Sequence, residues 1–124
     1  MIALDNRPGT RRLVSVRVLR DLSDQLGPGT SRQFVADYIG LWESRYARLV
    51  AALRTMDFPA AMDVVLSIKT ASQMAGAHTL ARLAADAQTL VRSEDHTGLL
   101  ALLEPLEKCG QDTMAELGQA LHAL

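Results

Sequence analysis

The side chains that offer chemistry in this sequence are three histidines, one cysteine and scattered carboxylates. An imidazole can accept a phosphoryl group or bind a metal ion, and a metal site needs several ligands at short spacing. His78, His96 and His122 each lie more than four residues from any other histidine or cysteine. Asp95 adjoins His96, but adjacent side chains on a helix do not share a face. We therefore expect surface histidines, no metal ion and no cofactor.

Patterns typical of a catalytic centre are also missing. The sequence contains no glycine-rich phosphate loop, no paired-carboxylate motif and no serine, histidine and aspartate arrangement. Cys109 is the single cysteine, which excludes an intramolecular disulfide and argues against a cysteine-based metal site. We expect a protein that is not an enzyme.

One apolar residue, Leu66, has an unusual position in a predicted helix. At a helical period of about 100° per residue, one stripe of this helix should face a core. The stripe consists of Ala61, Val65, Ile68, Ser72 and Ala75. Leu66 lies roughly 150° from the centre of the stripe, on the side shared with Asp63, Thr70 and Gln73, and Lys69 flanks it. The pattern predicts an exposed leucine, unless the helical phase is different or another element covers it.

The same stretch resembles the signature of histidine phosphotransfer (HPt) domains. In that family a phospho-accepting histidine precedes x-x-Lys-Gly-Ser/Ala-Ser/Ala, and Gly-Ala-x-x-Leu-x-x-Leu/Ala begins ten residues after the histidine. The matching residues are Lys69, Ala71, Ser72, Gly76, Ala77, Leu80 and Leu83. Two positions differ, because Leu66 stands at the acceptor position and Thr70 replaces the glycine.

The resemblance implies a fold and a function for about residues 13–121. The fold is an antiparallel up-and-down four-helix bundle with an additional N-terminal helix. The function lies in two-component phosphorelay signalling, where the surface around the acceptor docks a response-regulator receiver domain or a histidine kinase. Leucine has no nucleophile, so we expect docking without transport of phosphate. The expected binding surface consists of Leu66, Lys69, Thr70, Gln73 and Asp63.

A second register of the signature places His78 at the acceptor position. Ala81 then stands where the lysine belongs and Leu83 where a small residue belongs, so the first register matches better. His78 stays as the backup acceptor. An exposed Leu66 also fits a homodimer seam, and a self-association or scaffold module is the alternative function.

Bulk composition is that of an ordinary globular domain. Of the 124 residues, 48% are apolar and 22% are charged. Aromatic residues make up only 4%, and alanine and leucine outnumber the β-branched types, which favours helix. We find no signal-peptide core and no apolar run long enough to cross a membrane, so we expect a cytoplasmic protein without a membrane partner.

The N-terminal segment is basic, with Arg7, Arg11 and Arg12 close together. Residues 1–12 show little apolar periodicity and are predicted to form a flexible arm, followed by a helical bundle over residues 13–124. A basic arm can bind phosphate backbones. The net charge of −1 and the absence of a groove-reading motif argue against a nucleic-acid partner.

Apolar periodicity and boundary signals predict an all-α fold. The expected helices cover about residues 13–26, 30–54, 59–75 and 77–92, and a last helix begins at residue 93. Thr30 and Gln33 form a capping box for the second helix, and Asp57 should cap the third. Pro105 lacks a backbone N–H and should either kink the last helix or divide it in two.

Overall fold

The computed structural model describes residues 12–123, and all regular structure over this range is helical. The five helices found there are α1 (Val16–Leu26), α2 (Pro28–Arg54), α3 (Phe58–Met74), α4 (His78–Arg92) and α5 (His96–Ala123). The predicted all-α fold class is therefore confirmed. The predicted flexible arm, residues 1–12, lies outside the described residues apart from Arg12.

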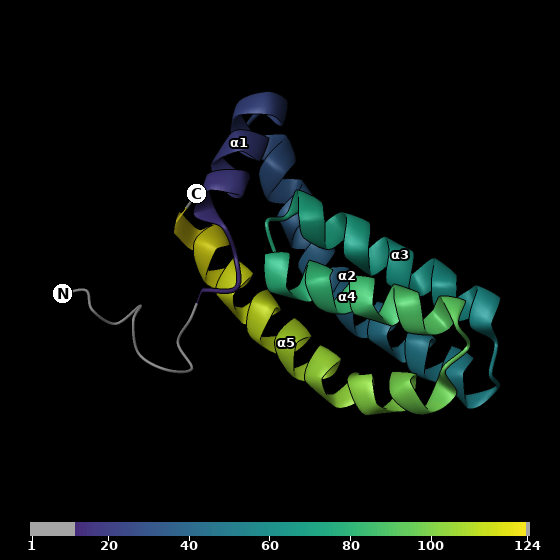
Figure 1. The fold of residues 1–124 in the computed structure, drawn as a ribbon. Helices are drawn as coiled ribbons and strands as arrows, with labels where there is room; N and C mark the ends of the chain where they lie inside the picture. The colour runs from purple at the N-terminus through teal and green to yellow at the C-terminus, as the bar shows by residue number, and fades with distance from the viewer. Residues whose placement is uncertain (1–11, 124) are drawn as a thin grey trace.

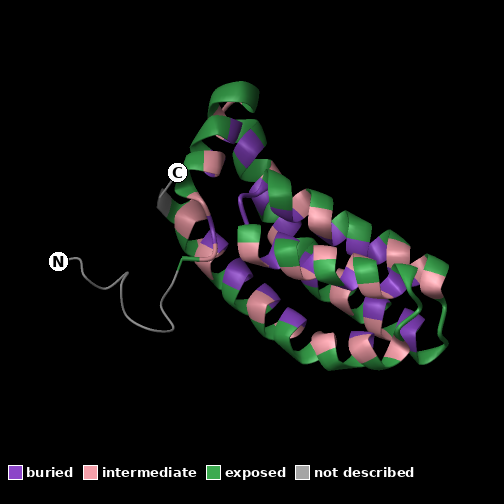
Figure 2. Cartoon of the chain, viewed as in Figure 1, coloured by how far each residue is buried: buried purple, intermediate pink, exposed green. Residues whose placement is uncertain are grey.

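Helices α2 to α5 pack side by side, and α1 packs on α2 (Figure 1). Helix α2 contacts both α3 and α5, and α4 contacts the same two helices. The buried side chains of these helices form one apolar cluster between them, and the exposed residues lie on the outer faces (Figure 2). Over residues 12–123 no helix is long and apolar enough to span a membrane.

The first helix begins three residues later than the sequence pattern predicts. The backbone N–H groups of Leu13 and Val14 donate hydrogen bonds to the carboxylate of Glu116 on α5, at 3.0 and 2.8 Å. The N–H of Ser15 donates to the carbonyl oxygen of Gly76, at 2.9 Å. These bonds hold the segment in a non-helical path, and α1 begins only after Ser15, whose hydroxyl caps it.

The predicted capping box of α2 is wrong. The helix begins at Pro28, and Gly27 precedes it with a φ of 87°, so Thr30 lies inside the first turn. Proline suits the first helical position because its φ is already helical and its missing N–H would have no intrahelical partner. The prediction for α3 is confirmed, since the side chain of Asp57 accepts a hydrogen bond from the N–H of Ala60 at 3.1 Å.

Helix α5 is a single helix, so of the two outcomes predicted at Pro105, a kink or a division, the division is excluded. Ala101, whose carbonyl would clash with the proline ring, and Pro105 are both exposed. Water can therefore solvate the carbonyl that loses its helical donor, and α5 continues as one curved helix (Figure 1). Asp95 lies before the helix and accepts a hydrogen bond from the N–H of Gly98 at 2.8 Å.

A buried glycine allows α5 to approach α2. A β-carbon at Gly110 would lie only 1.9 Å from an indole carbon of Trp42. The indole occupies the space that a side chain would fill, and Trp42 is only 4% exposed as a result. Apolar periodicity predicts a buried Trp42 but gives no reason to single out Gly110.

Candidate functional site

Helix α3 has a buried face and an exposed face, as the sequence predicts. The predicted core stripe, Ala61, Val65, Ile68, Ser72 and Ala75, is at most 1% exposed. Leu66 on the other side is 38% exposed. The structure therefore excludes the alternative in which Leu66 is a core residue.

Leu66 borders a hollow of about 420 Å³ between α2 and α3, which we call the α2–α3 hollow. It is lined by Phe34, Arg45, Leu66, Ser67, Thr70, Ala71 and Met74. Met74 is 44% exposed, so two large apolar side chains on the same helix face solvent around one depression. Water in such a depression is released when an apolar group from a partner fills it.

The five residues of the expected binding surface do not all meet at this hollow. Leu66 and Thr70 line it, whereas Asp63 lines a neighbouring hollow and Gln73 lines one next to α1. All four are exposed. Asp63 and Gln73 are ten positions apart, or about 15 Å along the helix axis, and this face of α3 therefore borders three separate hollows.

Lys69 points away from the α2–α3 hollow. Its ammonium group donates a hydrogen bond to the side-chain oxygen of Gln88 on α4, at 2.9 Å, and the side chain is half-buried. The cation beside Leu66 is instead Arg45 of α2, which the sequence reasoning missed. The sequence does indicate this position of Arg45, because Arg45 follows Tyr38 by seven residues, or about two helical turns. It therefore shares the α2 face that packs on α3.

Tyr38 and Ser72 join α2 to α3 through a hydrogen bond between their buried hydroxyl groups. Burial raises the pKa of Tyr38 to about 12, although the Ser72 bond and the charge of Arg45 act in the opposite direction. The phenol is therefore neutral at physiological pH. Its bond fixes the position of two helices next to the hollow and does not supply a reactive group.

The histidines differ in their surroundings. His78 and His122 are exposed, as predicted. The prediction of a surface histidine is wrong for His96, which is half-buried and donates a hydrogen bond from Nε2 to the carbonyl oxygen of Leu53, at 2.8 Å. The Leu53 carbonyl, in the last turn of α2, also accepts a hydrogen bond from the N–H of Met56 at 3.2 Å, so His96 is a second donor and joins the start of α5 to the end of α2.

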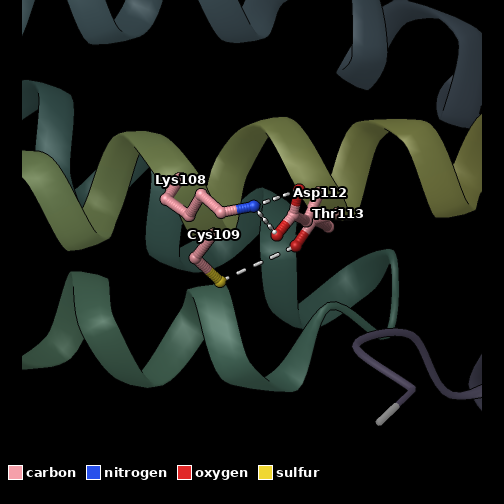
Figure 3. Close-up of polar contacts among 4 residues, drawn as sticks. All are labelled: Lys108, Cys109, Asp112 and Thr113. Atoms are coloured by element: carbon pink, nitrogen blue, oxygen red, sulfur yellow. Dashed lines mark hydrogen bonds and ion pairs between the residues drawn. The ribbon is translucent and has the colours of Figure 1, made fainter. Parts of the chain in front are cut away.

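Helix α5 carries the cysteine and a surface ion pair (Figure 3). Cys109 is half-buried with its sulfur 3.8 Å from the hydroxyl of Thr113, and burial raises the pKa of its thiol. Lys108 pairs with Asp112 at 2.8 Å. A thiol with a raised pKa is a poor nucleophile, and among residues 12–123 no three histidine, cysteine or acidic side chains form a metal-binding group. This part of α5 offers no reactive site.

The helical arrangement is that of an HPt-type fold. The solved structure of "histidine-containing phosphotransfer protein B (HptB)" from Pseudomonas aeruginosa PAO1 is similar, with a TM-score of 0.84 over 92% of this chain and 98% of that chain. Sequence identity is 22%, so the likeness shows a shared fold. No protein-family model and no curated protein matches the sequence.

Proposed function

We propose that this protein is an HPt-like module of two-component phosphorelay signalling that docks a response-regulator receiver domain without carrying phosphate. The observation that carries the proposal is Leu66, a 38% exposed hydrocarbon at the position that matches the phospho-acceptor of the HPt signature. The structural likeness to a phosphotransfer protein supports the scaffold. A leucine at this position can still make an apolar contact with a partner, but it cannot accept a phosphoryl group.

The proposal includes the antiparallel up-and-down order of the bundle. Three-residue connections, at residues 55–57, 75–77 and 93–95, join consecutive helices from α2 to α5. Each of these consecutive pairs also packs side by side. A short connection between packed neighbours favours opposite helix directions. Consecutive helices from α2 to α5 would then run antiparallel, and the exposed face of α3 would lie on the outside of the bundle.

Loss of the acceptor leaves docking as the function. The side chain of Leu66 cannot form a bond to phosphorus, and Lys69 is bonded to Gln88. A module of this kind would sequester a receiver or compete with an active phosphotransfer protein. An affinity of about 1 μM, which corresponds to roughly −8 kcal/mol, is sufficient for such competition.

The test combines binding and phosphotransfer with a panel of purified receiver domains. We expect one or more receivers to bind the wild-type protein, with no acid-labile phosphate transferred to it. Leu66→Arg should abolish binding, and Leu100→Arg is the matched control because Leu100 is 48% exposed on α5. Equal binding by wild type and Leu66→Arg would contradict docking at Leu66. Label on the wild type that disappears in His78→Gln would contradict the assignment of the acceptor position.

Self-association through the same surface is the alternative. A hollow with exposed apolar side chains also fits a second copy of the chain. Sedimentation of the wild type and of Leu66→Glu distinguishes the two functions. A dimer that dissociates in Leu66→Glu, together with no receiver binding, would replace the docking proposal with a homodimer.

A further inference from the structure

Arg45 is the charged residue at the α2–α3 hollow. It is half-buried and shares the hollow with Leu66 and Thr70, and the remaining lining residues from the described part of the chain are uncharged. Within residues 12–123, no carboxylate forms an ion pair with Arg45 and no acceptor bonds its guanidinium group. The fold therefore places a cation beside exposed apolar side chains without neutralising it.

Other cations on these helices have different surroundings. Lys69 is bonded to Gln88 on the far side of α3. Arg48, one turn after Arg45, lines a hollow that also contains Asp57 and Asp63. Arg45 therefore differs from Arg48, because the lining of the α2–α3 hollow contains no compensating carboxylate.

An unpaired guanidinium at such a place selects its partner. While the surface is free, water solvates the exposed part of the group. A partner that covers it without offering an acceptor removes this water, and an unpaired charge left in an interface weakens binding. A partner with a carboxylate forms a charge-assisted and often bidentate hydrogen bond instead.

We infer that Arg45 determines the specificity of this docking surface, and that it fits a receiver surface carrying a carboxylate beside a protruding apolar side chain. The apolar side chain enters the α2–α3 hollow against Leu66, and the carboxylate pairs with Arg45. The inference rests on the proposed function and adds the chemistry of the partner. In the HPt signature the lysine supplies the cation from the acceptor helix, whereas here Lys69 is turned away and α2 supplies it.

Charge also argues for a receiver over a second copy. A two-fold symmetric dimer places the same patch of both subunits against itself. Two Arg45 side chains would then approach each other over a hollow whose described lining contains no carboxylate. Like charges that meet in an interface disfavour the pairing.

The experiment measures the dissociation constant of a receiver that binds the wild type, at about 50 and 300 mM salt. We expect Arg45→Glu to weaken binding by at least about 30-fold at low salt. Arg45→Lys should weaken it by about three- to tenfold because an ammonium group cannot form the bidentate pair. Arg48→Glu is the matched control on the same helix. Its effect on the dissociation constant should stay within about threefold because Arg48 lies outside the α2–α3 hollow.

The partner residue is then identified by charge reversal. Replacing surface carboxylates of the receiver by arginine, one at a time, should yield one variant that loses binding to wild type and recovers it with Arg45→Glu. Unchanged binding of Arg45→Glu, with binding still lost in Leu66→Arg, would overturn the role of Arg45 and leave the docking function intact. A panel in which no receiver binds the wild type would overturn both.

Discussion

Helix α2 packs against α5 on one side, which we call the α5 seam, and against α3 on the other, which we call the α3 seam. The two seams differ in how their side chains pack. On the α5 side, Trp42 packs onto Gly110, next to a hollow of about 590 Å³. On the α3 side, the Tyr38–Ser72 hydrogen bond is followed by the α2–α3 hollow with Leu66. The hollow next to α5 is the larger, so volume alone would select it as the binding site.

Charge and exposure select the other seam. The hollow beside α5 is lined by Glu43 and Glu107 and by no cation among residues 12–123, and its large side chain Trp42 is 4% exposed. The α2–α3 hollow has the opposite charge and leaves Leu66 and Met74 at 38% and 44% exposure. An apolar side chain that the fold buries contributes to stability, and one that the fold leaves in solvent is available to a partner. Trp42 at the α5 seam therefore contributes to stability, and the exposed side chains at the α3 seam are those to which the proposed function assigns binding.

The largest effect should come from filling the space at Gly110. In Gly110→Ala, the new β-carbon would overlap the indole of Trp42, and we expect a loss of about 3 kcal/mol in the free energy of unfolding. Gly40→Ala is the control on α2, because nothing lies within 4 Å of its added β-carbon. It should stabilise the helix by about 0.5–1 kcal/mol. Urea unfolding followed by circular dichroism measures both, and equal stability of the two variants would contradict tight packing at the α5 seam.

The next largest effect is a loss of stability above pH 10, which Tyr38 at the α3 seam should cause. Burial raises the pKa of Tyr38 from 10.0 to about 12. Between these values the unfolded chain loses the phenolic proton and the folded chain keeps it, so the folded state binds more protons. The contribution of Tyr38 to the free energy of unfolding should therefore be fully present below pH 10. The free energy of unfolding should fall by about 2–3 kcal/mol between pH 10 and 12. Urea titrations at intervals of pH measure this decline.

Tyr38→Phe isolates the contribution of that phenol. The variant should be less stable at neutral pH by about 1–2 kcal/mol, because the buried hydroxyl of Ser72 loses its partner. Its decline above pH 10 should be shallower than that of the wild type. Tyr46 and Cys109 also have raised pKa values through burial, and they remain in both proteins. An identical decline in the two would show that Tyr38 ionises as freely in the folded state as in the unfolded one.

Periodicity within one helix predicts a face but not its neighbours. The sequence correctly placed the core stripe of α3 and the exposed side of Leu66, because both depend on the helical repeat alone. It did not place Lys69 on Gln88 or Arg45 beside Leu66, since each arrangement depends on how two helices align. The hollow belongs to two helices and is visible only after they pack.

Helix boundaries show the same limit, because the sequence reveals a boundary that nearby residues set but not one that a distant residue sets. Asp57 caps α3 as predicted, because a cap bonds to the backbone three residues away. Glu116 instead holds Leu13 and Val14 from more than 100 residues along the chain, and it removes the first turn that the apolar pattern predicts. Gly110 is similar, because its role is to have no side chain where Trp42 lies.

The smallest effect on stability should occur at the two residues with the largest expected effect on binding. Arg45→Gln loses no hydrogen bond or ion pair seen within residues 12–123, and its free energy of unfolding should change by less than about 0.5 kcal/mol. Leu66→Lys keeps an aliphatic stem against the helix surface, and its change should stay within about 1 kcal/mol. Thermal unfolding of both variants beside the wild type measures this. A loss of about 2 kcal/mol or more in Leu66→Lys, as for a buried leucine, would make Leu66 part of the structural core and remove the difference between the two seams of α2.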